Sequence, residues 1–506
     1  MAEIENIDVN QDVEAEIEIS PDKLEPMPHQ IECLKDSIGK LTKGVALYNT
    51  APMGSGKTLV TFLISKHFNK DLFVVSPPGA IMKLWKDNGA KWGVAVTCIS
   101  YDTLSGKGEK CNHEYLIKDN ENGDYTPTDA LYAHVDKGTI FVFDESDEAK
   151  NPKSQRLLAC HAISRAIVTR KGNTSKIILL SATPIDKPIF AESVVKLLGI
   201  IKHKQLYKHD KANKVLLWKD YGYGDIYNYC CMMDRKKMDT IHPPGTKINK
   251  SIISNSMFCM LRDIIKSRMG TSMPKPKLVA KFYPEIRYYT VPPDELIKFK
   301  ETMGGFRGAV AVDQNGGSNR GLVMDYLQAI EKNMLGLLIR IIEDKLKTLN
   351  KKLIVYVWFD ASVDYLIKAL RAFNPLRCDG QVDPDIRAEH IKLFQENNGN
   401  NRLIIAKPIC FAKGINLDDT FGGYPRDIIC VPDYRFNLIH QAAGRTHRSL
   451  TKSDTTFSLI FIKDADSLDI LRVLAEKSQT TSEIVVSKCD NDNKVIYPGE
   501  YPVFIN

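Results

Sequence analysis

The sequence predicts an α/β protein with two lobes, each a mostly parallel, doubly wound sheet, and a basic insertion or linker between them. Short apolar runs rich in Val, Ile and Phe alternate with longer stretches of helical periodicity, which is typical of a doubly wound sheet. These runs fall into two series, on either side of a basic stretch at about 201–285. At 506 residues the chain is also too long for one ordinary core.

Each series predicts the strands of one sheet. The first contains DLFVVSPP, VAVTCISY, GTIFVFDE and SKIILLSATP, with GVALYNT ahead of them, and the second contains KLIVYVWF, NRLIIAKP, RDIICVPD and TTFSLIFIK. We therefore expect five parts: a tail at 1–22, a first lobe at 23–200, the insertion or linker at 201–285, a second lobe at 286–486 and a tail at 487–506.

The net charge of +7 is unevenly distributed. Residues 1–25 hold nine acidic residues and one lysine, and we expect 1–22 to be disordered. Residues 201–280 hold 16 Lys and Arg against 6 Asp and Glu. That density fits a polyanionic partner, and a solvated lysine-rich surface is the alternative.

Composition argues against a membrane or secreted protein. No apolar run approaches the ~20 residues that span a bilayer. The acidic N-terminus lacks a signal pattern, and the 11 cysteines are scattered without a C-x-x-C pair. We expect a soluble, intracellular protein of the cytoplasm, nucleus or virion.

The stretch TAPMGSGKTLVTFLI predicts a phosphate-binding loop between a strand and a helix. Its glycines, Gly54 and Gly56, let backbone N–H groups converge on phosphate oxygens, Lys57 adds a positive charge, and the Thr58 hydroxyl is a Mg²⁺ ligand. The first glycine of the usual G-x-x-x-x-G-K-[ST] pattern is replaced by Ala51. The alternative is a chance match, which the strand before and the helix after it oppose.

Two carboxylates follow the apolar run GTIFVF. Asp144 and Glu145 would lie at the edge of the sheet that faces the phosphate loop. There Asp144 would hold Mg²⁺ and Glu145 would orient and deprotonate an attacking water. An acidic surface loop is the alternative.

The segment NLIHQAAGRTHRSLTKSD contains Arg445 and Arg448, three residues apart. On a helix they share a face, and two arginines aimed at one target suit a γ-phosphate. A basic helix that binds nucleic-acid phosphates, or nothing, is the alternative that spacing alone favours.

Taken together, these motifs resemble those of superfamily 2 helicases and translocases, within them the Swi/Snf-like branch. The resemblance covers about residues 24–465 and keeps the family's motif order. It is carried by PMPHQIECL, APMGSGKT, VVSPPGAIMKLWKDN, ISYDTLS, FDESDEAKNPKSQ, LLSATPIDKP, CDGQVDPDIRAEHIKLFQ, CFAKGINLDD and QAAGRTHRS.

The chain departs from the Swi/Snf pattern in three places. The acid box is D-E-S-D, the third motif is S-A-T where that branch usually has G-T, and Lys413 replaces a common glycine. With its compact size, these mixed features are similar to helicases of large DNA viruses, such as poxvirus-type transcription ATPases.

The resemblance implies that ATP is fuel, bound with Mg²⁺ between two RecA-like lobes. The implied ATP-binding residues are Gln30, Met53, Gly54, Ser55, Gly56, Lys57, Thr58 and Gln441. The implied catalytic residues are Lys57, Asp144, Glu145, Arg445 and Arg448, and the metal ligands are Thr58 and Asp144. Contacts to nucleic acid, or coupling to it, are implied for Ser76, Pro77, Ser181, Ala182, Thr183 and Gly414.

The expected activity is an ATP-dependent helicase or translocase acting on DNA or RNA, with DNA favoured, as a monomer, with transcription machinery as a further partner. The alternatives are a catalytically weak nucleic-acid-binding scaffold of a transcription complex, and a small-molecule kinase or GTPase switch, which would lack the second-lobe arginines. Trp85 sits in an apolar helical pattern and is interpreted as a packing residue.

Overall fold

The computed structural model describes residues 24–106, 114–119, 121, 123–210, 212–213, 215–314, 320–411, 416–448, 450–465, 468–485 and 501–506. The predicted acidic tail, Gly414 and Lys413, and residues 487–500 lie outside these ranges. Among the described residues, no helix combines the length and the apolar character needed to cross a membrane.

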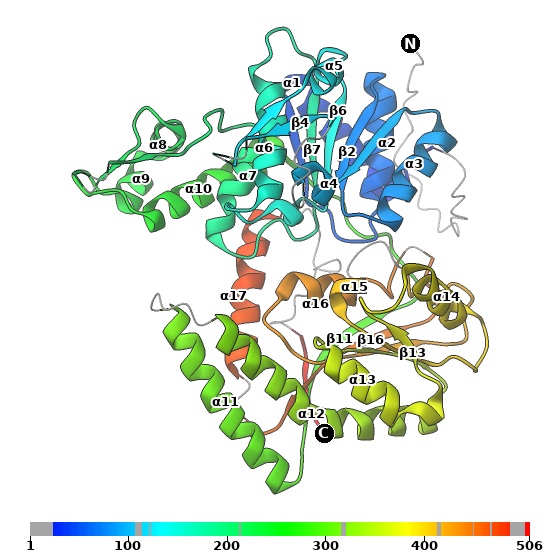
Figure 1. Cartoon of the computed structure of the whole chain (residues 1–506). Helices are drawn as coiled ribbons and strands as arrows, with labels where there is room; N and C mark the ends of the chain where they lie inside the picture. The colour runs from blue at the N-terminus through cyan, green and yellow to red at the C-terminus, as the bar shows by residue number, and fades with distance from the viewer. Residues whose placement is uncertain are drawn as a thin grey trace, which may run out of the picture.

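The first lobe is built on a six-stranded parallel sheet with strand order β10-β1-β7-β6-β2-β3 (Figure 1). Its strands are β1 (Ala46–Asn49), β2 (Leu72–Ser76), β3 (Val96–Ser100), β6 (Ile140–Asp144), β7 (Lys176–Leu180) and β10 (Gly270–Thr271). Alternate residues of one strand enter different cores: Leu72 and Val74 pack on one face of the sheet, Phe73 and Val75 on the other.

Helices cover both faces of this sheet. The residues of α1 (Ile31–Lys43), α2 (Lys57–Phe68) and α3 (Ala80–Trp92) share one core with it. The other core receives α4 (Tyr101–Ser105), α5 (Asp129–Asp136), α6 (Gln155–Thr169) and α7 (Ala191–Leu197). A small hairpin, β4 (Leu116–Lys118) and β5 (Tyr125–Pro127), lies between α4 and α5 in sequence.

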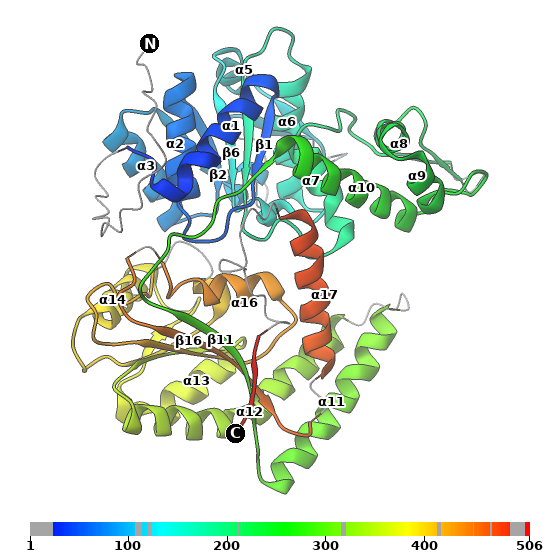
Figure 2. The same cartoon turned by 180° about the vertical axis from the view of Figure 1, so that it is seen from behind.

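Most of the basic stretch forms a helical protrusion on the side of the first lobe (Figures 1 and 2). It contains the hairpin β8 (Lys208–Asp210) and β9 (Val215–Leu217), then α8 (Gly222–Met233), α9 (Arg235–Ile241), α10 (Lys250–Ile264) and a π-helical turn at Ile265–Met269. Tyr223 is fully buried, its hydroxyl 3.0 Å from Ser256 Oγ and its ring 5.3 Å from that of Trp218. This tyrosine therefore builds the protrusion and is not free to stack on bases.

The second lobe carries a seven-stranded parallel sheet of order β13-β14-β12-β15-β16-β11-β17. Its strands are β11 (Phe282–Tyr289), β12 (Lys352–Tyr356), β13 (Leu376–Cys378), β14 (Leu403–Ala406), β15 (Arg426–Cys430), β16 (Thr455–Ile462) and β17 (Val503–Ile505). The helices are α11 (Pro293–Gln314), α12 (Arg320–Thr348), α13 (Asp360–Ala369), α14 (Pro384–Gln395), α15 (Pro408–Phe411), α16 (Phe436–Ala443) and α17 (Leu468–Ile484).

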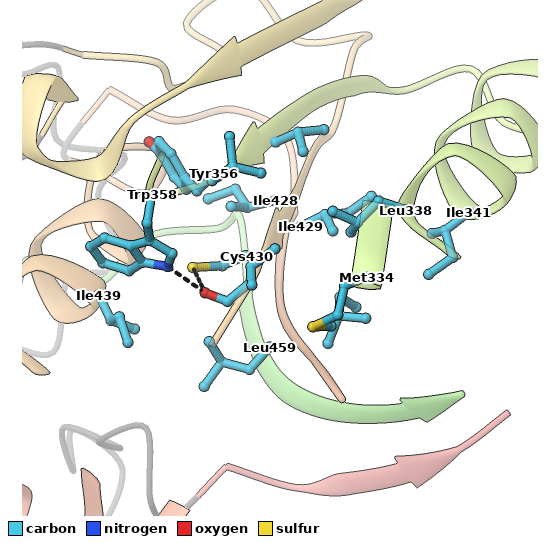
Figure 3. Packing of buried hydrophobic residues seen from close by; sticks show 14 of the residues in the cluster. Met334, Leu338, Ile341, Tyr356, Trp358, Ile428, Ile429, Cys430, Ile439 and Leu459 are labelled. Atoms are coloured by element: carbon cyan, nitrogen blue, oxygen red, sulfur yellow. Dashed lines mark hydrogen bonds between the residues drawn. The ribbon is translucent and has the colours of Figure 1, made fainter. Parts of the chain in front are cut away.

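The core of the second lobe joins this sheet to α12. Figure 3 shows Leu338 of α12 beside Ile429 of β15, and Ile428 on the side of Tyr356. Trp358 lies in the same core and donates from its indole Nε1 to the Val431 carbonyl at 2.8 Å. The predicted fold class, two mostly parallel α/β lobes, is confirmed.

Several strands fall where the sequence predicted none, among them β8, β9, β11 and β13, and two of the shortest strands pair with the sheets of the lobes. β10 lies inside 201–285 but pairs with β1 of the first lobe, and β17 lies inside 487–506 but pairs with β11 of the second. Strands of two or three residues show no hydrophobic period, so pattern reasoning has nothing to detect.

Helix α17 runs from the second lobe to the first (Figures 1 and 2). Ile470 and Leu474 near its start belong to the core of the second lobe, whereas Ile484 at its end is buried in a core of the first. The Thr481 hydroxyl donates to the Ile185 carbonyl of the first lobe at 2.7 Å.

Candidate nucleotide-binding cleft

The glycine loop lies between β1 and α2 and is held by the segment before α1. Gly54 and Gly56 have φ of 77° and 89°, which strain a side-chain-bearing residue. Gln30 is fully buried: its Nε2 donates to the Ser55 carbonyl at 3.0 Å and its Oε1 accepts from the Met27 N–H. A Cβ on Gly56 would stand 2.1 Å from Gln30 Nε2, so this position requires glycine. Gln30 thus holds the glycine loop in place through its hydrogen bond to the Ser55 carbonyl.

Lys57 is the first residue of α2, and its ammonium lies within the loop. Nζ donates to the carbonyls of Ala51 and Pro52 at 2.8 and 3.2 Å. Burial lowers the pKa of Lys57, and the positive charges of Arg448 and Arg445 add to this, while Glu145 and Asp144 oppose it. The lysine thus stands between two carboxylates and two guanidinium groups.

The acid pair ends β6 at the edge of the sheet that carries the glycine loop. Asp144 Oδ2 accepts from the Trp85 indole N–H at 2.8 Å, and Oδ1 accepts from the Glu145 N–H at 3.0 Å. Burial, and then the charge of Glu145, raise the pKa of Asp144 to about 6. Glu145 itself has φ 49°, a conformation that costs a non-glycine residue about 1–3 kcal/mol and often marks a functional site.

The second lobe contributes Arg445 and Arg448 to the same place. Both line one pocket of about 420 Å³ together with Lys57, Asp144 and Glu145. Their Nε atoms, and Nη2 of Arg445, are buried and have no hydrogen-bond partner among the described residues. Burial lowers the pKa of Arg448 to about 10. Because buried guanidinium groups without partners are costly, the pocket fits an anion.

The prediction that Arg445 and Arg448 share a helical face is wrong. Helix α16 ends at Ala443, and Gly444 caps it, so both arginines lie in the turns that follow. Gln441 is still on the helix; it is buried, and its Oε1 also has no partner among the described residues.

The two lobes touch at the glycine loop. A Cβ on Gly54 would lie 3.7 Å from Arg448 Cγ. A Cβ on Gly444 would lie 2.6 Å from Met53 Cε. Met53 therefore packs on the turn that presents the arginines, and the lobes are closed at this point.

The S-A-T segment is hydrogen-bonded to the acid box. Ser181, Ala182 and Thr183 are buried, and the Ser181 hydroxyl donates to Asp147 Oδ1 at 3.2 Å. The Thr183 N–H donates to the same hydroxyl at 3.1 Å. Three residues further on, Asp186 pairs with Lys150 at 3.1 Å. The S-A-T segment is thus hydrogen-bonded to the acid box, and it precedes Ile185, whose carbonyl α17 contacts.

The turn after β2 buries two residues that were predicted to contact nucleic acid. Ser76 and Pro77 are buried, and Ser76 Oγ donates to the Pro77 carbonyl at 3.1 Å. Pro78, Gly79 and Ala80 are the exposed residues, at the start of α3. A nucleic-acid backbone approaching this turn would meet residues 78–80 first.

The oxygen ligands of the cleft fit Mg²⁺. Within the described ranges, no group of three or more His, Cys, Asp or Glu residues could hold a metal ion. Mg²⁺ does not need such a group, because it commonly binds one or two carboxylates plus substrate phosphates and water. Thr58 contributes a hydroxyl and Asp144 a carboxylate to the pocket, which Arg445 and Arg448 also line.

Sequence reasoning missed the hydrogen bond of Trp85 beside the cleft and several residues of its lining, among them Asp418. Trp85 is fully buried as predicted, but it also donates to Asp144. Asp418 of the second lobe lines the pocket with 2% exposure. Its Oδ2 accepts from Thr451 Oγ1 at 3.3 Å, and that hydroxyl accepts from the Arg448 N–H at 2.7 Å. The one signal was the acid pair D-D that follows the CFAKGINL segment.

Comparison with known proteins agrees with the motifs. No family model matches the chain. It is 23% identical, over 473 residues, to a protein of Acanthamoeba polyphaga mimivirus named "Putative ATP-dependent RNA helicase L364", covering 90% of this chain and 83% of the viral protein. The resemblance to viral superfamily 2 helicases is confirmed.

A solved structure also matches this helicase-like chain. It is the Sulfolobus solfataricus SWI2/SNF2 ATPase core in complex with dsDNA, with 16% identity and a TM-score of 0.30. The match covers 90% of this chain and 93% of that one.

Proposed function

We propose that this chain is an ATP-dependent nucleic-acid helicase or translocase that hydrolyses ATP between its two lobes and steps along DNA or RNA. One observation carries the proposal: Lys57, Asp144 and Glu145 of the first lobe and Arg445 and Arg448 of the second line a single pocket. A kinase or a switch GTPase does not require the second-lobe arginines.

Each side chain has a role that follows from its position. The glycine loop and Lys57 hold the outer phosphates, and Glu145 orients the attacking water and accepts its proton. Arg445 and Arg448 stabilise the charge that develops on the transferred phosphoryl group. Gln441 offers its unpartnered carbonyl oxygen to the substrate or its water. Bound Mg²⁺, held by Thr58 and Asp144, would neutralise phosphate charge.

Stepping follows from closure and reopening of the cleft. Because the arginines and Lys57 belong to different lobes, ATP holds the lobes together and phosphate release lets them part. Ser181, Ala182 and Thr183 pass this movement from the acid box towards the nucleic acid. Residues 78–80, which follow the buried Ser76 and Pro77, are the proposed nucleic-acid contacts of the first lobe, and contacts to phosphates make binding salt-sensitive. The role predicted for Gly414 stays a proposal from the sequence.

The proposed organisation is that of a monomer, since one chain supplies both halves of the pocket. We keep the division into lobes at 23–200 and 286–486, with the protrusion and linker at 201–285 between them and tails at 1–22 and 487–506. By analogy with poxvirus-type ATPases, we propose transcription machinery as the further partner and an intracellular or virion location.

ATP turnover with and without double-stranded DNA, single-stranded DNA and RNA tests the function. We expect stimulation by at least one nucleic acid, loss of turnover in Lys57→Ala, and a slowing on the order of 10³-fold with little change in ATP affinity in Arg448→Ala. Arg170→Ala is the matched control, because this arginine pairs with Asp136 at the surface and does not line the pocket.

The same assay separates the proposal from its alternative. A scaffold would bind nucleic acid without stimulated turnover, and Lys57→Ala would then equal the wild type. The preferred polymer in the panel would distinguish a DNA motor from an RNA motor.

A further inference from the structure

The linker between the two sheets passes the glycine loop on its way from β10 to β11. The Thr50 N–H donates to the Thr271 carbonyl at 2.9 Å, which fixes the start of the linker beside the loop. Lys275 follows four residues later and lines a cavity of about 600 Å³. Pro52 and Met53 of the loop and Gly444 of the arginine turn line the same cavity. Met53 also lines the phosphate pocket, so the two hollows adjoin there.

The cavity is basic. Its charged lining residues are Lys275, Lys277 and Lys281, and none of its described lining residues is Asp or Glu. Burial lowers the pKa of His440 and of His447, which also line the cavity, so neither adds a charge. Lys275 Nζ lies 6.0 Å from the centre of the Phe282 ring, and no ion pair joins it to a described carboxylate. Burial, together with the positive charges of Arg448 and Lys57, lowers the pKa of Lys275 to about 8.

Such an arrangement is unfavourable without an anion. A partly buried cation beside other cations loses hydration and gains repulsion, and a nearby negative charge offsets both. The cavity that Lys275 lines adjoins, at Met53, the pocket lined by Lys57 and Arg448, to which the proposed function gives the phosphates of ATP. A triphosphate at Lys57 and Arg448 would supply the missing charge to Lys275 as well.

We infer that Lys275 is a further phosphate-binding residue, by which the interlobe linker itself contacts the triphosphate of bound ATP. The inference rests on the proposed nucleotide site. It gives the linker a direct interaction with nucleotide that depends on the number of phosphates, because ADP lacks the group nearest the arginines. The junction of the lobes would then distinguish ATP from ADP without relying on the arginines alone.

Binding of a non-hydrolysable ATP analogue and of ADP, measured by calorimetry without nucleic acid, tests this role. Lys275→Met keeps the length of the side chain and removes the charge. We expect about tenfold weaker binding of the analogue, equal to ~1.4 kcal/mol, and less than about threefold weaker binding of ADP. Lys275→Arg should retain most of the affinity. Lys277→Met is the matched control, since Lys277 is exposed at the rim of the cavity, and it should change affinity less than about twofold.

Wild-type affinity in Lys275→Met would overturn the inference, as would equal losses for the analogue and ADP or a loss that Lys277→Met shares. Thermal unfolding of Lys275→Met without nucleotide gives a second readout: if the Lys275 charge is partly buried and lacks an anion, the apo variant should be at least as stable as the wild type. A lower midpoint would instead make Lys275 structural. Failure of the proposed function looks different, because the wild type would then bind the analogue but show no turnover stimulated by nucleic acid.

Discussion

Trp85 both packs in the core of the first lobe and donates a hydrogen bond to Asp144. Its ring packs 5.3 Å from that of Phe62, and its N–H fixes one oxygen of Asp144. Trp92 packs on the same phenylalanine at 4.9 Å, but its buried N–H has no hydrogen-bond partner in the described part of the chain. Both tryptophans pack on Phe62, but only Trp85 orients the Asp144 carboxylate. Substitutions of the two residues can therefore distinguish these effects.

We predict that Trp85→Phe raises the Mg²⁺ concentration needed for half-maximal ATP turnover about tenfold, because groups that orient a metal ligand typically contribute 10–100-fold to metal affinity. Trp92→Phe should leave this concentration unchanged. A magnesium titration of both variants makes the comparison. Equal shifts in the two would mean that packing on Phe62, and not the hydrogen bond, supports the site.

Predictability at the residue scale depends on whether the signal is local. Gly54, Gly56 and Lys57 could be predicted because the residues of the glycine loop follow one another in sequence. Asp144 and Glu145 could be predicted because they end an apolar strand. The partners of these residues could not: Gln30 against Gly56, Trp85 against Asp144 and Thr451 under Arg448 are contacts between distant segments. A pattern along the chain carries no information on them.

At the element scale, Glu331 fastens helix α12 to the start of α13. It is 1% exposed, and its two oxygens accept from the N–H groups of Trp358 and Phe359 at 2.7 and 3.1 Å. Burial raises the pKa of Glu331 from 4.5 to about 7, although the two N–H groups oppose the shift. The carboxyl therefore binds a proton more tightly in the folded chain than in the unfolded one.

The sign of the pH effect follows. Between pH 4.5 and about 7 folding takes up a proton at Glu331, so its contribution to the free energy of unfolding falls as the pH rises and is constant above that window. A shift of this size corresponds to on the order of 3 kcal/mol. We predict that the unfolding midpoint of the wild type, relative to Glu331→Gln, falls by roughly 5 °C or more between pH 5 and pH 8.

Thermal unfolding of both proteins at the two pH values measures this difference. Glu343→Gln is the control, because Glu343 lies on the same helix but is exposed and pairs with Lys347. Its midpoint relative to the wild type should not vary with pH. A difference between the wild type and Glu331→Gln that is constant with pH would show that Glu331 holds the same charge in both states.

Strands were predictable where they are buried and mostly apolar. The runs that became β2, β6, β12 and β16 are fully or almost fully buried, and most of their residues are apolar, so the pattern is plain. The eight-residue β11 is only partly buried, contains Pro, Glu and Arg, and was not predicted. The edge strands β10 and β17 have two and three residues, and their pairing depends on the neighbours β1 and β11. The turn of Arg445 and Arg448 was predicted as helix because their spacing fits one, whereas Gly444 ends it.

At the scale of the whole molecule, three segments connect the lobes. The linker carries Lys275 past the glycine loop, the arginine turn packs on Met53, and α17 spans from one core to the other. The end of α17 makes further contacts with the first lobe: Glu483 pairs with Arg262 of α10 at 3.2 Å. A helix anchored at both ends would limit how far the two lobes can separate.

Removing one anchor of α17 should free the lobes without unfolding either. Ile484 is fully buried in the first lobe and Leu474, on the same helix, is fully buried in the second. Replacing either by Ala costs about 2–5 kcal/mol of local packing, but only Ile484→Ala weakens the connection between the lobes. We predict that Ile484→Ala increases the radius of gyration in solution scattering and splits thermal unfolding into two transitions, because the lobes then unfold independently. Leu474→Ala should lower the midpoint of a single transition and keep the wild-type radius. If the two variants behave alike, α17 is only a packing element of the lobes and the linker and the arginine turn alone hold them in register.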